Sequence, residues 1–135
     1  MQRNALVLAK SLSLGEVGNV AAILMGQLAQ IVPTLFAEQP VLDEDKVRHA
    51  GIKYSTVVLK GGSGQIANLA KSLIERPEIH SVVFTATGQS LNNRFAEYAA
   101  TIGQKKLVEL QPVGIALSGE DSAIRALTKK FSLLQ

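Results

Sequence analysis

Cysteine and tryptophan are absent from this 135-residue chain, and its aromatic residues are four phenylalanines and two tyrosines. The absence of cysteine excludes disulfide bonds, thiolate metal sites and a cysteine nucleophile. Because aromatic side chains are scarce, leucine, isoleucine, valine and alanine must fill the hydrophobic core. The longest apolar run, from Val20 to Met25, is far shorter than the roughly 20 residues of a membrane-spanning helix. We therefore expect no membrane span and no membrane partner.

The composition predicts one ordered domain with a weak basic bias. Hydrophobic residues make up 47% of the chain and charged residues 19%, which is typical of a folded globular protein. The length predicts a single domain, residues 1–135. The net charge is +3, whereas tight binders of the phosphate backbone make about 6–10 cationic contacts, so tRNA is allowed as a partner but not favoured. The opening residues lack a signal-peptide pattern, and we expect a cytoplasmic protein.

Strand-like and helix-like apolar patterns alternate along the chain. Continuous apolar runs predict buried strands, and apolar residues three or four positions apart predict helices. The predicted strands span 5–9, 56–59, 81–84 and 113–117, and the predicted helices span 17–31, 66–74, 91–102 and 124–134. Strands separated by helices imply a three-layer α/β/α fold with a mixed, mostly parallel four-stranded sheet.

Two segments do not fit this alternation. The first, residues 36–54, has a charged centre and is either a hairpin or a long surface loop. In the second, Val108 and Leu110 alternate with polar residues, which favours an added edge strand or an extended arm. Long irregular connections in compact domains are often functional, so the first segment is a candidate part of a site.

A glycine-rich turn follows the second predicted strand. Gly62, Gly64 and Ala67 match the spacing of a phosphate-binding loop, in which backbone amides and the helix dipole attract phosphate. The acidic residue expected about 20 positions later is missing, because the next strand ends at Phe84 and Thr85. We therefore interpret the segment as a tight turn that packs a helix onto the sheet.

Three carboxylates and an imidazole lie close together in the irregular segment. Asp43, Glu44, Asp45 and His49 could hold a divalent cation or form an acid/base pair. Their spacing matches neither an EF-hand loop nor a zincin helix. The pattern thus favours a solvated loop, and we assign no metal and no cofactor to the chain.

Polar side chains end two of the predicted strands. Lys10 and Ser11 follow the first strand, and Thr85 and Thr87 follow the third. Ligands of open α/β sheets bind outside the carboxyl ends of the strands, so these side chains either line a binding crevice or are hydrated strand ends. In a crevice, Lys10 would meet a carboxylate or phosphate.

Both ends of the chain carry a family resemblance. The first strand of the peptidyl-tRNA hydrolase type II superfamily is similar to Ala-Leu-Val-Leu-Ala-Lys at 5–10. The helix entry of that superfamily is similar to Gly-Asn-Val-Ala-Ala at 18–22. The segments 114–119 and 124–128, with Leu133 and Leu134, resemble the last strand and helix of that family. The resemblance implies the fold of this superfamily and, for an active member, hydrolysis of peptidyl-tRNA.

A branch of uncharacterised small bacterial proteins with this fold is more similar still. Its shared pattern of Asp-x-Asp followed by Arg/His-x-Gly-Ile comprises Asp43, Asp45, Arg48, His49, Gly51 and Ile52. Its tyrosine-bearing third helix is matched by Arg-Phe-Ala-Glu-Tyr at 94–98. This likeness covers nearly the whole chain and implies a bacterial protein of unknown function.

Two departures from the hydrolase pattern bear on the chemistry. Where the hydrolases carry a helix-entry lysine that is implicated in catalysis, this chain has Asn19. If that lysine stabilises a developing oxyanion, its loss costs on the order of 3–4 kcal/mol of transition-state stabilisation. The Asp-Ala-Gly-x-Thr run of the hydrolases is replaced by 106–111, which contains neither Asp nor Thr. Both changes imply that the inherited reaction is lost or altered.

The sequence supports three functional hypotheses. The first is a protein without hydrolase activity that binds an unidentified small ligand or partner in the strand-end crevice. The residues assigned to that crevice are Lys10, Asn19, Asp45, His49 and Thr85. The second is a divergent hydrolase of peptidyl-tRNA or a related aminoacyl ester, in which Lys10 replaces the missing cation. The third is a homo-oligomeric structural module, most simply a homodimer, that covers an exposed sheet edge.

Overall fold

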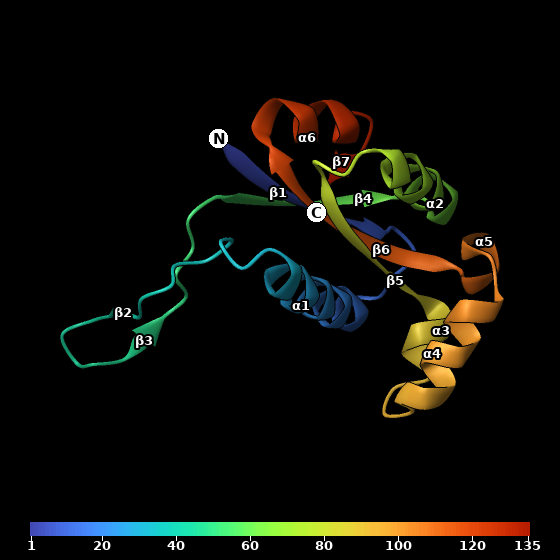
Figure 1. Ribbon diagram of the computed structural model, residues 1–135, viewed down its shortest axis with the longest axis horizontal. Helices are drawn as coiled ribbons and strands as arrows, with labels where there is room; N and C mark the ends of the chain where they lie inside the picture. The colour runs from blue at the N-terminus through green and yellow to red at the C-terminus, as the bar shows by residue number, and fades with distance from the viewer.

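A five-stranded mixed sheet in the order β5-β6-β1-β4-β7 forms the centre of the computed structural model, which describes residues 1–135 (Figure 1). Its strands are β1 (Gln2–Ala9), β4 (Ser55–Gly61), β5 (His80–Thr85), β6 (Pro112–Glu120) and β7 (Ser132–Leu133). β1 and β4 are parallel, β6 runs antiparallel to both β1 and β5, and β7 runs antiparallel to β4. The predicted α/β class with a mixed sheet is therefore confirmed.

Two details of the predicted sheet are wrong. The sheet has five strands instead of four, and β1 with β4 is the one parallel pair among its four pairings. The fifth strand was hidden in the predicted helix 124–134, because the helix ends at Thr128 and the chain returns to the sheet as β7. Phe131 drives this return: its ring packs against Gly61, where a Cβ would lie 2.6 Å from the ring.

Helices cover both faces of the sheet. α1 (Leu14–Ile31) lies on one face, against β1, β5 and β6, while α2 (Ser63–Ser72) and α6 (Asp121–Thr128) lie on the other (Figure 1). A short 3-10 turn, η1 (Leu73–Glu75), extends α2. β1 and β6 are buried along almost their whole length, so the hydrophobic core lies on both sides of these two strands. None of the helices combines the length and apolar character needed to cross a bilayer.

Local chemistry sets both ends of α1. Ser13 and Glu16 form a capping box, in which the Ser13 hydroxyl accepts from the Glu16 amide and the Glu16 carboxylate accepts from the Ser13 amide at 3.0 Å. The helix ends before Pro33, which cannot continue it. Between these ends, an apolar stripe formed by Val20, Leu24 and Leu28 is fully buried against the sheet.

Three short helices follow the carboxyl end of β5. They are α3 (Ala86–Ser90), α4 (Phe95–Gln104) and α5 (Leu107–Leu110). The predicted helix 91–102 is confirmed as α4 but was started four residues too early, because residues 91–94 form a turn in which Asn93 has a φ of 67°. The edge strand or extended segment predicted at Val108 and Leu110 is wrong, because these residues form the helix α5. The Glu109 side chain accepts from the Lys106 amide at 2.8 Å and caps this helix.

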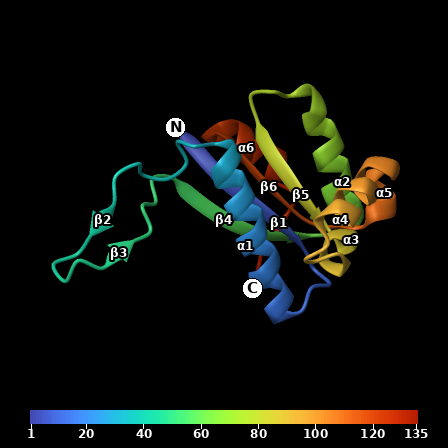
Figure 2. The same cartoon turned by 60° about the horizontal axis from the view of Figure 1, so that its bottom comes forward.

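The irregular segment is a hairpin that projects from the body. β2 (Val41–Leu42) and β3 (Arg48–His49) form a separate two-stranded sheet, and Figures 1 and 2 show it standing clear of the helices and of the main sheet. A bridge between Phe36 and Ile52 closes its base. We call residues 37–51 the arm. Of the two alternatives that the sequence left open, the hairpin is correct.

Candidate functional site

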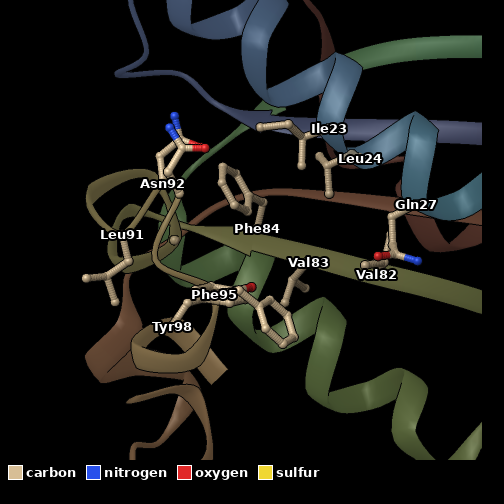
Figure 3. Close-up of a pocket in the computed structure, with 12 residues that line it drawn as sticks. Ile23, Leu24, Gln27, Val82, Val83, Phe84, Leu91, Asn92, Phe95 and Tyr98 are labelled. Carbon is tan, nitrogen blue, oxygen red and sulfur yellow. The ribbon is translucent and has the colours of Figure 1, made fainter. Parts of the chain in front are cut away.

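A pocket of about 500 Å³ lies beside β5, between α1 and the α3–α4 segment (Figure 3). Twelve residues line it. α1 contributes Ile23, Leu24 and Gln27, β5 contributes Val82, Val83 and Phe84, and the segment after β5 contributes Gly88, Leu91, Asn92, Asn93, Phe95 and Tyr98. The pocket thus lies along the outer edge of β5, which pairs only with β6.

The lining of the pocket is apolar and uncharged. Eight of the twelve residues are hydrophobic, and the polar groups are the carboxamides of Gln27, Asn92 and Asn93 together with the hydroxyl of Tyr98. Because no charged side chain lines the pocket, an ionic ligand would lose hydration without gaining a counter-charge. The chemistry of the lining therefore suits an uncharged molecule that can accept and donate hydrogen bonds.

The turn after β5 shapes one wall of the pocket. Thr85 ends the strand, and its hydroxyl accepts from the Gly88 amide at 3.0 Å, which caps α3. Gly88 packs on Phe84, because a Cβ at that position would lie 2.6 Å from the Phe84 ring. The break at Asn93 then turns the chain back, so that both Asn92 and Phe95 line the pocket (Figure 3).

The entry of α1 is tied to the same region. The Gln89 amide donates to the Glu16 carboxylate at 3.5 Å and so links α3 with the first turn of α1. The pKa of Glu16 is held below its usual range, mainly by the hydrogen bond from the Ser13 backbone. The Ser13 side chain and the Gln89 side chain lower this pKa further. The carboxylate is therefore ionised at neutral pH and serves as a cap and a link to α3.

Three of the five predicted site residues lie at the pocket end of the molecule. Lys10 is exposed just after β1, where its amide donates to the Gly61 carbonyl at 3.0 Å. Asn19 is exposed on α1, one helical turn before Ile23 of the pocket lining. Thr85 is 3% exposed and lies behind the pocket wall, with its oxygen engaged in the α3 cap.

The other two predicted residues, Asp45 and His49, lie in the arm. The chain enters the arm after the end of α1, whose 18 residues span about 27 Å. The structure therefore does not bring Asp45 and His49 together with Lys10 and Asn19 within one chain. His49 instead bonds Asp43, with 2.7 Å between its Nε2 and the carboxylate.

Asp43 organises the tip of the arm. One oxygen of its carboxylate accepts from the amides of Asp45 at 2.8 Å and Val47 at 3.1 Å, and the other contacts His49. These bonds hold the pKa of Asp43 below its usual range, and the bond to His49 contributes most. Lys46 completes the turn with a φ of 69°. No group of three or more His, Cys, Asp or Glu side chains is placed to hold a metal ion.

A buried polar row crosses the sheet and was not found from the sequence. The Ser118 hydroxyl donates to Asn4 at 2.8 Å, and the Asn4 amide donates to the Thr56 hydroxyl at 3.3 Å. Asn4 is 2% and Ser118 1% exposed, so neither can meet a ligand. The row satisfies polar groups between β6, β1 and β4, and we assign it to the pairing of these strands.

The glycine-rich turn after β4 has contacts that suit the tight-turn interpretation. The Gly62 amide donates to the Gln65 side chain at 2.9 Å, which caps α2. One of the amides that a phosphate would need is thus occupied by the chain itself.

The residues that sequence reasoning missed are those of the pocket wall after β5. Leu91, Phe95 and Tyr98 were interpreted as the core-facing stripe of one helix, yet no residue of α4 is buried and Phe95 is 78% exposed. One signal was available: the adjacent Asn92 and Asn93 are residue types that favour turns over helix interiors.

Comparison with known proteins shows the family. The model of DUF2000, a protein family of unknown function, matches residues 2–135. The chain belongs to the DUF2000 family. The predicted membership in a family of uncharacterised proteins is thereby confirmed, whereas neither the family nor the structural comparison links this DUF2000 protein to the peptidyl-tRNA hydrolase type II superfamily. Among curated proteins, none matches the sequence.

A solved structure has the same fold. It is a protein of unknown function from Agrobacterium tumefaciens strain C58, with a TM-score of 0.85 and 17% sequence identity over 99% of this chain and 98% of that chain. At that identity the likeness concerns the fold alone. The function therefore has to be argued from the site itself.

Proposed function

We propose that this DUF2000 protein binds an uncharged small molecule with aromatic or other apolar surface in the pocket beside β5. The observation that carries the proposal is a pocket of about 500 Å³ whose lining is two-thirds hydrophobic and otherwise uncharged. Ligand pockets of proteins have volumes of about 300–1,000 Å³ and combine apolar walls with a few polar groups. The carboxamides of Gln27, Asn92 and Asn93 supply those groups.

The apolar side of α4 supports this proposal. Phe95 and Tyr98 lie on one face of α4, three residues apart, and both line the pocket. The chain covers this face only in part, since Phe95 is 78% exposed and Tyr98 is half-buried. A bound molecule with a flat apolar surface would cover the two rings, and aromatic pairs add about 0.5–1.5 kcal/mol beyond the burial of area.

The same lining disfavours hydrolysis at this pocket. It contains no serine, histidine, lysine or carboxylate, so it offers neither a nucleophile with an adjacent base nor a cation for an oxyanion. Asn19, one turn from the pocket on α1, is likewise a neutral carboxamide. The proposal is therefore a binding protein and not an esterase acting in this pocket.

A pair of matched probes tests the proposal. Benzamide and benzoate have the same ring and differ in charge, so we expect benzamide to shift the amide NMR signals of Val82–Phe84 and Asn92. Benzoate should bind at least about tenfold more weakly. Phe95→Ala, which removes an exposed ring and spares the core, should abolish the shifts. Ile74→Ala removes a side chain that is 79% exposed elsewhere on the surface and should leave them unchanged.

Two results would contradict the proposal. One is the absence of any shift at the pocket with benzamide, indole and Nile red at about 1 mM, a concentration that detects weak fragment binding. The other is equal binding of benzoate and benzamide. Turnover of peptidyl-tRNA that disappears in Lys10→Ala would instead support the alternative of a divergent hydrolase.

A further inference from the structure

The arm exposes apolar side chains and has no core of its own. Val41, Leu42 and Val47 are 46%, 52% and 57% exposed. The arm contains only two strands of two residues each, and Figure 2 shows that no helix of the body covers it. Isolated two-stranded hairpins are at best marginally stable in water. The arm therefore lacks a partner that would cover its apolar side chains.

The outer face of α1 is also without a partner, and it is almost uncharged. Eleven residues of α1 are exposed, and Glu16 is the one charged residue among them. The others include Gly18, Ala22 and Gly26, whose small side chains allow another segment to approach the helix backbone closely. They also include the apolar Ile23 and Ile31. An apolar segment could pack on this face without stripping water from a charge.

These surfaces hold most of the exposed apolar side chains of the molecule. Twelve large hydrophobic side chains are exposed in all. Seven of them belong to α1 or to the arm with its base: Leu14, Ile23, Ile31, Val41, Leu42, Val47 and Ile52. Clustering of this kind marks a protein interface, because single exposed apolar residues are otherwise scattered.

Charge divides the molecule in a complementary way. The arm holds four of the eleven carboxylates but only two of the fourteen lysines and arginines. Asp43, Glu44 and Asp45 form its tip. The rest of the chain keeps twelve cations and seven carboxylates. Two of these cations, Lys10 and Lys60, lie at the carboxyl ends of β1 and β4, next to the chain segment that enters α1.

We infer that the arm of one copy packs along α1 of a second copy of this chain, with its acidic tip beside Lys10 and Lys60 of that copy. The dimensions agree: the eight residues from 37 to 44 reach about 26 Å when extended, and α1 is about 27 Å long. The apolar side chains of the arm would then cover the uncharged face of α1. The tip would meet cations in place of water.

A second copy is the partner that these observations favour, because one chain offers both halves of the contact. About a two-fold axis, each copy gives one arm and receives one, which closes the assembly as a dimer. In this dimer, Asp45 and His49 of one copy come beside Lys10 and Asn19 of the other, so residues that one chain holds apart share a site.

Charge reversal tests the inference by sedimentation equilibrium. Glu44→Lys with Asp45→Lys, and separately Lys10→Glu with Lys60→Glu, should each weaken self-association by at least about tenfold. An equimolar mixture of the two variants should dimerise as the wild type does, because both contacts in the mixed dimer again join opposite charges. Lys129→Glu with Lys130→Glu, at the end of α6 on the opposite face of the sheet, is the matched control and should have no effect.

Cross-linking tests the placement of the tip. Since the chain has no cysteine, a variant with Asp45→Cys and Lys10→Cys should form a disulfide-linked dimer on mild oxidation. A variant with Asp45→Cys and Lys130→Cys should stay largely uncross-linked. A monomer at about 100 μM, a dimer indifferent to both charge reversals, or equal cross-linking of the two cysteine pairs would each overturn the inference.

Discussion

At the residue scale, two of the polar side chains singled out by the sequence hold the backbone of their own segment. Thr85 caps α3, and Asp43 binds two amides of the arm turn. Their partners lie within six residues along the chain, which is why type and spacing made them visible. The hydrogen bond from Ser118 to Asn4 joins residues 114 positions apart, and no local sequence pattern predicts it.

The Asp43 carboxylate predicts a pH dependence of the arm. Its pKa is lowered from 3.8 by the hydrogen bond from His49 and then by that from the Val47 amide. A carboxyl group whose pKa is lower in the folded arm than in the unfolded chain stabilises the arm above the unfolded value, and this contribution is lost as the pH falls through the folded value. We expect the amide NMR signals of Asp45 and Val47 to move toward random-coil positions as the pH falls below about 4.

Asp43→Asn is the control for this titration. The amide oxygen can still accept from the Asp45 and Val47 amides, but the side chain does not ionise. The Val47 amide signal should then no longer move toward its random-coil position below pH 4. Titration of the same size in Asp43→Asn would show that another group controls the turn.

At the scale of the elements, the distance between α1 and the sheet depends on one glycine of β6. A Cβ at Gly114 would lie 2.8 Å from Leu24, 3.0 Å from Leu8 and 3.0 Å from Val20. Gly114→Ala should therefore force α1 outward and lower the free energy of unfolding by about 1–3 kcal/mol. Urea denaturation measures this change.

Gly64→Ala is the matched control for that substitution. Gly64 lies in α2 with nothing within 4 Å of its Cβ position. Alanine there should leave the stability unchanged or raise it by up to about 1 kcal/mol, because glycine is a poor helix former. If both variants lost the same stability, close packing of α1 on β6 would not be the reason.

The misassigned elements have a common cause. The patterns of 91–102 and 124–134 suit helices, but each contains a point where tertiary contacts prevail. Asn93 turns the chain at the pocket, and Phe131 turns it toward Gly61. Helical periodicity reports that a face is apolar, and it does not report which surface will cover that face.

At the scale of the whole molecule, the arm is predicted to be dispensable for the fold of the body. The Ala37 amide donates to the Gly51 carbonyl at 2.8 Å, so two glycines in place of residues 38–50 can close the gap. We expect the midpoint of thermal unfolding to change by less than about 4 °C in dilute protein, while self-association is lost. Unfolding of the shortened chain would show that the arm stabilises the body directly.

The sequence by itself determined the α/β class, the helix that ends at residue 31, the four longer strands and the polar residues that flank them. These features depend on interactions within one or two turns of helix or along one strand, so residue type and spacing are sufficient to indicate them. Lys10 and Thr85 were placed at one end of the sheet because strands of one direction end on the same side, whereas Asn19 was assigned from the family resemblance.

Only the tertiary structure decided the strand order β5-β6-β1-β4-β7, the reversal of β6 and β7, and the pocket beside β5. The pocket joins Ile23 to Phe84 and Phe95, which lie more than sixty positions away in the chain. It also decided that α1 separates Lys10 from His49 within one chain. The physical reason is that these arrangements depend on contacts between distant segments, whose energies no local pattern of residues contains.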